Sequence, residues 1–299
     1  KVFKKDGFVL SEPDVLLDSN YIIERSGENF RKIMLTFETD AGKSMCLRPD
    51  LTVASCIKYL KDNSKANSKI YYSGQAYRKS QSLNKVINYQ LGLEIFGSKN
   101  KSIDDLKVLK TITNSINKIK IKNISIKVGD VSLFKQLIES LKIPERWRMR
   151  LKRHFWRPQY FEDLLDRLET NSDVDPSTVE LDKKKFFEMK NIDQNKEVAN
   201  RKISEIISRF GRKIKDPRSF KENKKTVKII KDFLKINCPL DKLEKTLNNF
   251  INKNQLSKTV FKDLSSLKNL SRLNSKITFS TNFGRDIEYY SGVVFEIYN

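Results

Sequence analysis

Two stretches of the chain, at residues 69–78 and 88–97, alternate side-chain types with the two-residue period of a β-strand. Between them lies the polar connection "KSQSLNKVI", which is shorter than the crossover that parallel neighbours require. The pattern therefore predicts a long antiparallel hairpin.

The same alternation sorts the side chains of this hairpin by face. On the second strand, one face is apolar, and we expect it to be the core face: Tyr89, Leu91, Leu93 and Ile95. The opposite face combines polar and small residues from both strands: Gln90, Gly92, Glu94 and Phe96 with Tyr72, Gly74, Ala76 and Arg78. Because each of the two facing strands carries a glycine on this side, which leaves room where side chains would otherwise stand, we expect a shallow polar trough floored by Gly74 and Gly92.

Buried polar groups in such a trough need partners, since an unpaired one costs about 1–3 kcal/mol. One interpretation is that Arg78 satisfies Glu94 within the chain. The other is that Gln90 and Glu94 serve a ligand.

The residues around the hairpin indicate an α+β fold. Strand-like runs at 32–39 and 43–50 flank the turn "DAG", and a helix is predicted over 51–61. Beyond Gly129 the pattern becomes helical: Asp130 is a plausible N-cap for an apolar stripe that ends before Pro144. Further helices are predicted at 146–156, 160–169, 200–210 and 227–236, with a polar surface loop over 169–185.

Strand patterning returns over 276–299. The simplest architecture is an antiparallel sheet flanked by helices and interrupted by a helical insertion. We expect residues 1–128 and 275–299 to form a discontinuous sheet core, and residues 129–274 to form the mainly helical insertion.

Composition narrows the class of protein. Apolar residues make up 38% of the chain and aromatic residues 10%, and no run reaches the eighteen or so apolar residues of a membrane-spanning helix. The three cysteines lack metal-ligand spacing, so we expect a cytoplasmic protein without a membrane role. Because the chain starts without Met and stops inside an apolar run, we also expect it to be part of a longer one.

The formal net charge of +22 favours nucleic acid, nucleotides or an acidic protein as partners. The simpler interpretation is biased composition, since Lys is scattered along the chain among many Asn and Ile. In "RWRMRLKRHFWR" six basic residues are interleaved with aromatic ones, which can indicate RNA binding, although the solvated face of a helix is the favoured interpretation. Nucleic acid is therefore not an expected partner.

Cofactor and metal chemistry find little support in the sequence. His154 is the single histidine, so neither a His-based triad nor a multi-His metal site can form. No Walker or Rossmann glycine pattern occurs. We expect no His-based catalytic site, no metal and no cofactor.

Four ordered motifs then become informative: "LRPDLT", "KIYYSGQAYR", "YQLGLEIFG" and "RDIEYYSG". Together they resemble the catalytic core of histidyl-tRNA synthetase and its relatives, a class II synthetase-like fold. The resemblance covers about the first 100 residues and the last 25.

The resemblance implies that the trough is a pocket for free L-histidine. Acceptors for the α-ammonium would be Asp50, Thr52 and Gln90, while Arg285 would bind the α-carboxylate through its planar fork of donors. Glu94 and a tyrosine hydroxyl would contact the imidazole. The resemblance favours Tyr290 as that tyrosine, with Tyr289 as the alternative, and Arg78 completes the expected binding set.

The departures from the family pattern concern ATP. Ser80 stands where the synthetases have a glutamate that reads adenine, and no Arg occurs between Lys79 and Gln90. Losing positioned donors to the reacting phosphate typically costs about 10²–10³ in rate each. We therefore expect amino-acid adenylation to fail.

One branch of the family has lost aminoacylation, and "GDVSLFKQLIESLKIPERWRMRLKRHFW" also looks like that branch. It comprises noncatalytic regulatory subunits that assemble with, and activate, a short-form ATP phosphoribosyltransferase at the first step of L-histidine biosynthesis, and that take part in feedback inhibition by histidine. The resemblance implies that catalytic subunit as a partner, self-association as a dimer, and histidine as the ligand. The alternatives are a divergent histidyl-tRNA synthetase and a basic RNA-binding module.

Overall fold

The computed structural model describes residues 2–26, 28–62, 67–80, 85–170, 176–193, 196–198, 201–214, 220–273, 276–285 and 290–299. Its contacts divide the chain into two compact units. The first comprises Lys1–Ser125 with Leu264–Ser275 and Asn299, and the second comprises Ile126–Asp263 with Lys276–Tyr298.

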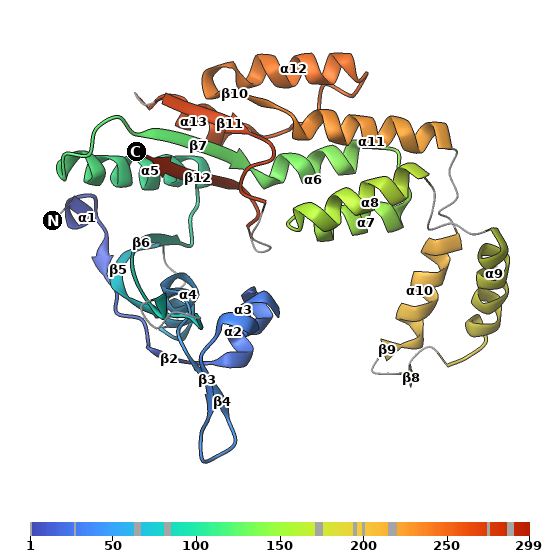
Figure 1. Cartoon of the computed structure of the whole chain (residues 1–299), viewed down its shortest axis with the longest axis horizontal. Coiled ribbons are helices and arrows are strands. Elements are labelled where there is room, and N and C mark those ends of the chain that lie inside the picture. The colour runs from blue at the N-terminus through green and yellow to red at the C-terminus, as the bar shows by residue number, and fades with distance from the viewer. Residues whose placement is uncertain are drawn as a thin grey trace. The chain divides into compact units, whose positions relative to one another are not determined.

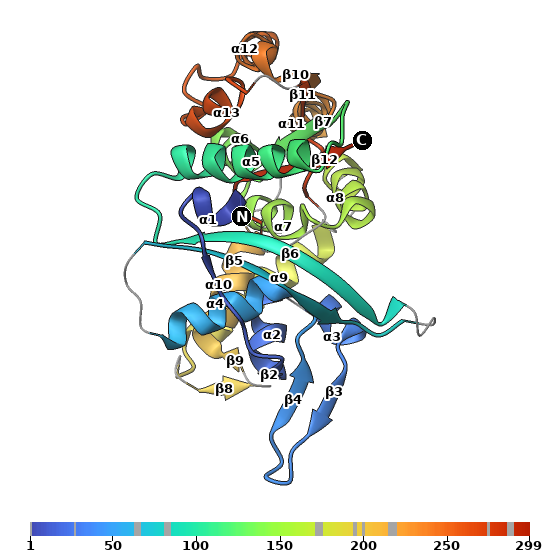
Figure 2. The ribbon, with the colours of Figure 1, turned by 90° about the vertical axis from the view of Figure 1, so that its left-hand side faces the viewer.

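The first unit contains the predicted hairpin. Strand β5 (Ser68–Tyr77) pairs antiparallel with β6 (Ile87–Phe96) (Figure 2). The short β1 (Val9–Leu10) lies parallel to β5. Both long strands start and end one residue before the predicted bounds. Their register pairs Tyr72 with Gly92 and Gly74 with Gln90, so the side chains assigned to the polar face do share one face.

Helix α4 (Leu51–Lys61) packs against both hairpin strands and has the predicted bounds. It begins there because Asp50 is its N-cap: the backbone of Asp50 is extended, and its Oδ1 accepts a hydrogen bond from the Val53 N–H at 2.8 Å. The cap therefore fixes the Asp50 carboxylate at the edge of the hairpin.

Two smaller groups complete the first unit. Strands β2 (Leu16–Asp18), β4 (Ser44–Leu47) and β3 (Thr36–Glu38) form an antiparallel sheet beside α2 (Ser19–Ser26) and α3 (Glu28–Ile33). Helix α3 takes the start of the run predicted as a strand over 32–39. Helix α5 (Lys101–Lys118) packs against α1 (Val2–Lys5) and α13 (Ser265–Leu270).

The prediction of the core face of the hairpin is wrong. Tyr89 is 80% exposed and Leu91 is 63% exposed, whereas Tyr72 and Ala76 on the polar face are buried. Helix α4 and the Asp50 cap lie against the polar face, and burial follows that packing rather than the side-chain alternation.

The second unit contains a four-stranded sheet in the order β10 (Asn237–Pro239), β11 (Lys276–Ser280), β7 (Ser125–Asp130), β12 (Val293–Tyr298) (Figure 1). The closing strands thus pair with β7, and the contacts group them with the helices. The predicted boundaries of a sheet core and a helical insertion stay a prediction.

Five helices of the second unit surround an aromatic core: α6 (Val131–Ser140), α7 (Glu145–His154), α8 (Pro158–Thr170), α11 (Phe220–Leu234) and α12 (Leu243–Lys253). Phe134 stacks on Phe155 with ring centroids 3.7 Å apart and meets Phe161 edge-on. The predicted N-cap is confirmed, because Asp130 Oδ1 accepts from the Ser132 N–H at 2.8 Å.

Helices α9 (Pro176–Lys190) and α10 (Ile203–Ile214) pack side by side, with the two-stranded β8 (Glu197–Val198) and β9 (Arg201–Lys202) between them in sequence (Figure 1). The surface loop predicted over 169–185 is therefore wrong for 176–185, which are helical, while 171–175 lie outside the described residues. Across the described ranges, no helix has the length and apolar character to cross a membrane.

Candidate functional site

The polar face of the hairpin is filled by the chain's own side chains. A Cβ atom built on Gly92 would lie 2.3 Å from the Tyr72 hydroxyl, and one on Gly74 would lie 2.8 Å from the Arg48 guanidinium. The two glycines therefore make room for Tyr72 and Arg48 instead of flooring an open trough.

A hydroxyl network occupies the space above Gly92. The Tyr72 hydroxyl donates its single proton to Glu94 Oε1 at 3.0 Å, so in the 3.0 Å contact with Thr52 the Thr52 hydroxyl is the donor. Burial and the nearby Glu94 carboxylate raise the pKa of Tyr72, so it remains a neutral donor. The network joins the start of α4 to both strands.

Two carboxylates lie close together at this network. Burial raises the pKa of Asp50 above its usual range, and the Val53 N–H and the Arg78 guanidinium offset part of that shift. Burial also raises the pKa of Glu94, and the charge of Asp50 adds to the increase. Asp50 Oδ2 is buried and has no hydrogen-bond partner among the described residues. The site is thus rich in acceptors and suited to a ligand that donates hydrogen bonds or carries positive charge.

Gln90 and the arginines have partners within the chain. Gln90 Oε1 accepts from the Leu51 N–H at 3.0 Å, which ties β6 to the first residue of α4. Arg78 Nε donates to the Pro49 carbonyl at 2.7 Å, and across the described residues it makes no ion pair with Glu94. Arg48 is buried and donates to the carbonyls of Gln75 and Pro13. The internal Arg78–Glu94 interpretation is therefore wrong: Tyr72 is the partner of Glu94.

The structure brings five of the expected site residues together in the first unit: Asp50, Thr52, Arg78, Gln90 and Glu94. Arg285 and Tyr290 belong to the second unit, and Tyr289 lies outside the described residues. Arg285 is buried against the rings of Phe155 and Phe161 and donates to Asn282 Oδ1 at 3.0 Å. Its role as a carboxylate anchor, like the roles of the other site residues, stays a prediction.

Strand alternation through the closing segment would place Arg285 and Tyr289 on one face and Tyr290 on the other. That pattern requires an unbroken strand from 276 onward, but β11 ends at Ser280 and β12 begins at Val293. The choice between the two tyrosines thus depends on the family resemblance alone.

Tyr72 is the residue that sequence reasoning missed as a member of the site. Its signal was present, because the register places it opposite Gly92 on the face of Gln90 and Glu94. A large side chain opposite a glycine can lie across the glycine's strand, and Tyr72 does so.

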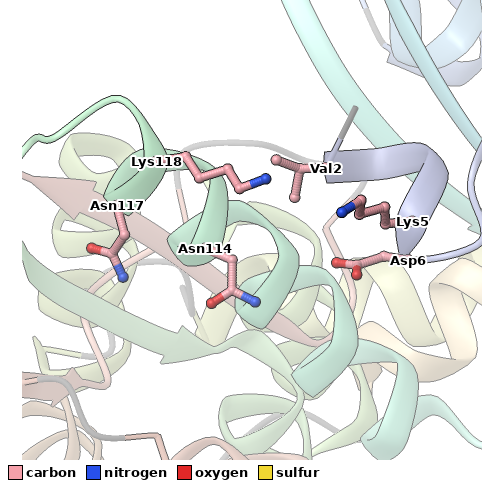
Figure 3. A pocket seen from close by; sticks show the side chains of 6 residues that line it. All are labelled: Val2, Lys5, Asp6, Asn114, Asn117 and Lys118. Carbon is pink, nitrogen blue, oxygen red and sulfur yellow. The ribbon is translucent and has the colours of Figure 1, made fainter.

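One further cavity of about 420 Å³ lies between α1 and α5 (Figure 3). Its lining consists of Val2, Lys5, Asp6, Asn114, Asn117 and Lys118. No predicted site residue lines it. In the described part of the chain, no group of three or more His, Cys, Asp or Glu side chains is placed to hold a metal ion.

Comparison with known families gives the class of protein. A family model described as histidyl-tRNA synthetase matches residues 1–208, which is more than half of the chain. The chain therefore belongs to the histidyl-tRNA synthetase family.

Curated relatives narrow the similarity to one branch. The chain is 23% identical to the ATP phosphoribosyltransferase regulatory subunit of Allorhizobium ampelinum, over 99% of this chain and 83% of the relative. It is 24% identical to the protein of the same name from Rhizobium rhizogenes, over 92% of this chain and 78% of that one.

Solved structures agree on the class II synthetase-like fold. A chain of the ATP phosphoribosyl transferase complex from Thermotoga maritima superposes with a TM-score of 0.53 at 21% identity, covering 100% of this chain and 84% of that one. A regulatory subunit/histidyl-tRNA synthetase from Bacillus halodurans gives 0.56 at 15% identity, covering 100% of this chain and 66% of that one.

Proposed function

We propose that this chain is the noncatalytic regulatory subunit of a short-form ATP phosphoribosyltransferase, which it activates by assembly at the first step of histidine biosynthesis. The relatives that carry this name align along nearly the whole chain, and one solved neighbour comes from such a complex. Ser80 and the lack of arginines between Lys79 and Gln90 argue against the synthetase alternative, because the reacting phosphate would have few positioned donors.

The proposed ligand of the polar face is free L-histidine. The observation that carries this proposal is the buried Asp50 Oδ2, an acceptor without a hydrogen-bond partner in the described residues, beside a second desolvated carboxylate on Glu94. The histidine α-ammonium supplies three donors and a positive charge, and its imidazole supplies one N–H or two. Both groups would favour the ionised carboxylates and offset the cost of burying them.

Feedback inhibition would follow if histidine binds two states of the complex with different affinity. A coupling free energy of about 1–3 kcal/mol is typical. Bound histidine must then change the affinity for the substrates of the catalytic subunit by the same factor by which those substrates change the affinity for histidine. In this proposal, the polar face of the hairpin is the site at which the complex binds histidine and responds to it.

The experiment that tests the function is reconstitution. We expect the chain to co-purify with the short catalytic subunit, to raise its activity, and to make that activity sensitive to histidine. Glu94→Gln should retain assembly and activation but lose most of the histidine inhibition, whereas Glu38→Gln, at an exposed position of β3, should behave as the wild type.

Two outcomes would contradict the proposal. Histidine-dependent exchange of pyrophosphate into ATP by the purified chain would establish the synthetase instead. Unchanged inhibition in Glu94→Gln would reject the pocket while leaving the regulatory role in place.

Self-association as a dimer is a further part of the proposal. The exposed apolar face of the hairpin, at Ile87, Tyr89 and Leu91, supports it because large apolar patches usually mark protein contacts. Light scattering of wild type and Leu91→Asp tests it: we expect a dimer and a monomer, respectively, and equal masses would reject this face as the contact.

We also propose a cytoplasmic location. Among the described residues, no disulfide joins Cys46, Cys56 and Cys238, as expected in a reducing compartment. Fractionation of the source cells tests this proposal, and recovery outside the cytoplasm would reject it.

A further inference from the structure

The cavity between α1 and α5 is lined from both helices by charged and amide side chains (Figure 3). Helix α1 contributes Lys5 at its end, with Asp6 directly after it, and the C-terminal end of α5 contributes Asn114, Asn117 and Lys118. Val2 is the one apolar residue of the lining. The volume of about 420 Å³ falls in the range of about 300–1,000 Å³ that small-molecule sites occupy. Both helices belong to the first unit, so the cavity lies within one compact body.

The side of α5 that meets α1 is polar, whereas contacts between helices are usually apolar. Its members are Lys107, Thr111, Asn114 and Lys118, which follow the i, i+4, i+7, i+11 spacing of one helix side. The buried Thr111 hydroxyl donates to Asp6 Oδ2 at 2.6 Å and so holds the end of α1 against this side. The polar residues beyond Thr111 then face the cavity instead of a packed core.

The α1 wall of the cavity is held in place by its own capping motif. The helix ends because Gly7 adopts a φ of +83°, and the N–H groups of Phe8 and Gly7 donate to the carbonyls of Phe3 and Lys4, respectively. The Phe8 side chain is buried, and the Phe3 ring lies 5.4 Å from the ring of Tyr71 on β5. These contacts fix α1, so the cavity is preformed.

The two lysines of the lining lack a carboxylate partner. Across the described residues, neither Lys5 nor Lys118 makes an ion pair or a side-chain hydrogen bond. Asp6, the carboxylate of the lining, accepts from Thr111 instead, and its charge also acts on Lys107. Burial and the neighbouring Lys69 lower the pKa of Lys107, and the charge of Asp6 offsets part of that shift. The positive charge at the cavity therefore stays uncompensated.

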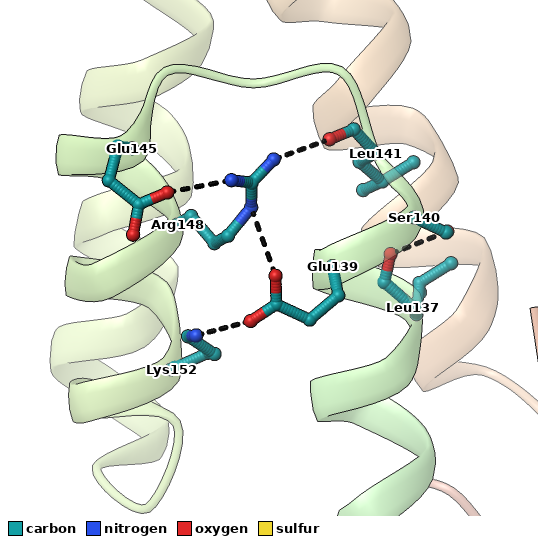
Figure 4. Close-up of polar contacts among 7 residues, drawn as sticks. All are labelled: Leu137, Glu139, Ser140, Leu141, Glu145, Arg148 and Lys152. Atoms are coloured by element: carbon teal, nitrogen blue, oxygen red, sulfur yellow. Dashed lines mark hydrogen bonds and ion pairs between the residues drawn. The ribbon is translucent and has the colours of Figure 1, made fainter.

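Another helix pair shows how the chain neutralises cations by itself (Figure 4). Between α6 and α7, Arg148 pairs with Glu145 at 2.7 Å and with Glu139 at 3.5 Å, and Lys152 also pairs with Glu139. The lysines at the cavity have no such glutamates. Figure 3 shows their amino groups extending from the two helices into the space between them. Because like charges that share a space repel each other, a bound anion would be favoured there.

Phosphate matches this lining better than carboxylate. The lysine ammonium is a compact point charge that binds phosphate, and it lacks the planar fork with which arginine suits a carboxylate. A phosphate ester carries about 1.5–2 negative charges and can neutralise both lysines, whereas one carboxylate can neutralise only one. The amides of Asn114 and Asn117 can donate to phosphate oxygens, and with Asp6 they can accept from hydroxyl groups. The lining has no aromatic ring for a stacked base, which argues against a nucleic acid.

We propose that the cavity between α1 and α5 binds a small phosphorylated metabolite, with the phosphate held by Lys5 and Lys118 and the hydroxyl groups held by the asparagines and Asp6. The site is separate from the polar face of the hairpin, since none of its residues belongs to the expected histidine set. It goes beyond the proposed function and does not depend on it.

The test is a calorimetric titration of the chain with ribose 5-phosphate, which carries both a phosphate and hydroxyl groups. Lys5→Gln with Lys118→Gln removes the two charges of the lining. Lys4→Gln with Lys110→Gln, the matched control, removes two exposed charges of the same helices outside the lining. We expect the first variant to bind on the order of 10- to 100-fold more weakly and the control to bind within about 3-fold of the wild type.

A third variant tests the space rather than the charge. Asn114→Leu keeps the net charge but removes an amide and places an apolar side chain in the lining, so about 10-fold weaker binding is expected. Circular dichroism checks folding, because Lys118 in the last turn also complements the carbonyl end of α5. If the lysine double variant does not fold, Lys5→Gln with Asn114→Leu takes its place.

Ribose and citrate serve as comparison probes. Ribose should not bind detectably, and citrate should bind more weakly than ribose 5-phosphate. Citrate binding as tightly as ribose 5-phosphate would overturn the assignment to phosphate. Equal weakening in the two lysine double variants would mean that the ligand responds only to the net charge of the chain, and absence of binding to the wild type would overturn the site itself. Each of these failures would leave the proposed regulatory function untouched.

Discussion

The two faces of the β5–β6 hairpin reverse the usual relation between polarity and burial. One face carries Tyr72, Gln90 and Glu94 and is covered, whereas the other carries Tyr89 and Leu91 and is exposed. A fold chosen for stability alone would bury the apolar face, since each large apolar side chain gains about 1.5–3 kcal/mol on burial.

The proposed function assigns another molecule to each face, histidine to the covered one and a second copy of the chain to the exposed one. On the covered face, the Tyr72 hydroxyl and the Asp50 cap satisfy part of the polar network, and the remaining carboxylate capacity suits a cationic ligand. On the exposed face, the apolar side chains suit another protein surface. If the proposal holds, both faces give up stability for binding, as is common at functional sites.

The largest effect is expected when the covered face is overpacked. Gly92→Val places methyl groups where the Tyr72 ring lies and must displace it. We expect the free energy of unfolding to fall by about 2–3 kcal/mol in urea titrations. Leu91→Val, the neighbouring change on the exposed face, should alter it by less than about 0.5 kcal/mol. Equal losses for the two variants would contradict the claim that one face is tightly packed and the other exposed.

A smaller loss is expected when the network loses its hydroxyl. Tyr72→Phe keeps the ring but leaves Glu94 Oε1 and the Thr52 hydroxyl without that partner, which costs about 1–2 kcal/mol. Tyr89→Phe, at a mostly exposed ring, is the matched control and should cost less than about 0.5 kcal/mol. If both variants unfold at the same urea concentration, the Tyr72 hydroxyl contributes no more to stability than the exposed Tyr89 hydroxyl, and the prediction is wrong.

The smallest expected change is a gain in the free energy of unfolding, and the size of this gain depends on pH. Because the pKa of Glu94 is raised on folding, the folded chain binds a proton that the unfolded chain has already lost, so stability falls as pH rises from the unfolded to the folded pKa. Above the folded pKa, Glu94 is ionised in both states, and burying its charge lowers the free energy of unfolding by a constant amount. Glu94→Gln should therefore stabilise the ligand-free chain at pH 7.5 by about 0.5–1 kcal/mol, with a smaller gain at lower pH.

Thermal unfolding across this pH range measures the difference. Glu38→Gln, whose side chain is exposed, should show no such trend. A destabilised Glu94→Gln at pH 7.5 would mean that the ionised carboxylate is fully satisfied by the chain itself.

Local signals predicted much of this fold. Helix α4 has its predicted bounds because the Asp50 cap is a local interaction, and Asp130 caps α6 for the same reason. The two-residue period of the hairpin strands placed Gln90 and Glu94 on one face, as the observed strand pairing confirms. These features depend on residues within a few positions of each other or directly across a strand pair.

The errors concern tertiary packing. Alternation cannot tell which face α4 covers, so the apolar face at Leu91 was assigned to the core. The polar composition of 176–185 indicated a loop, but α9 forms there and packs against α10. For the site, the glycines of the two strands were interpreted as open space, and Tyr72 fills the space at Gly92.

The central claim is that the Asp50 carboxylate faces a bound histidine, and calorimetric titration of the chain with L-histidine tests it most directly. Asp50→Asn keeps a side chain that caps α4 but removes the charge, and Asp130→Asn makes the same change at the cap of α6. We predict that wild type and Asp130→Asn bind histidine equally and that Asp50→Asn binds on the order of 10- to 100-fold more weakly, as expected for one lost charge-assisted hydrogen bond. Equal affinity in all three proteins, or no binding to the wild type, would contradict the claim.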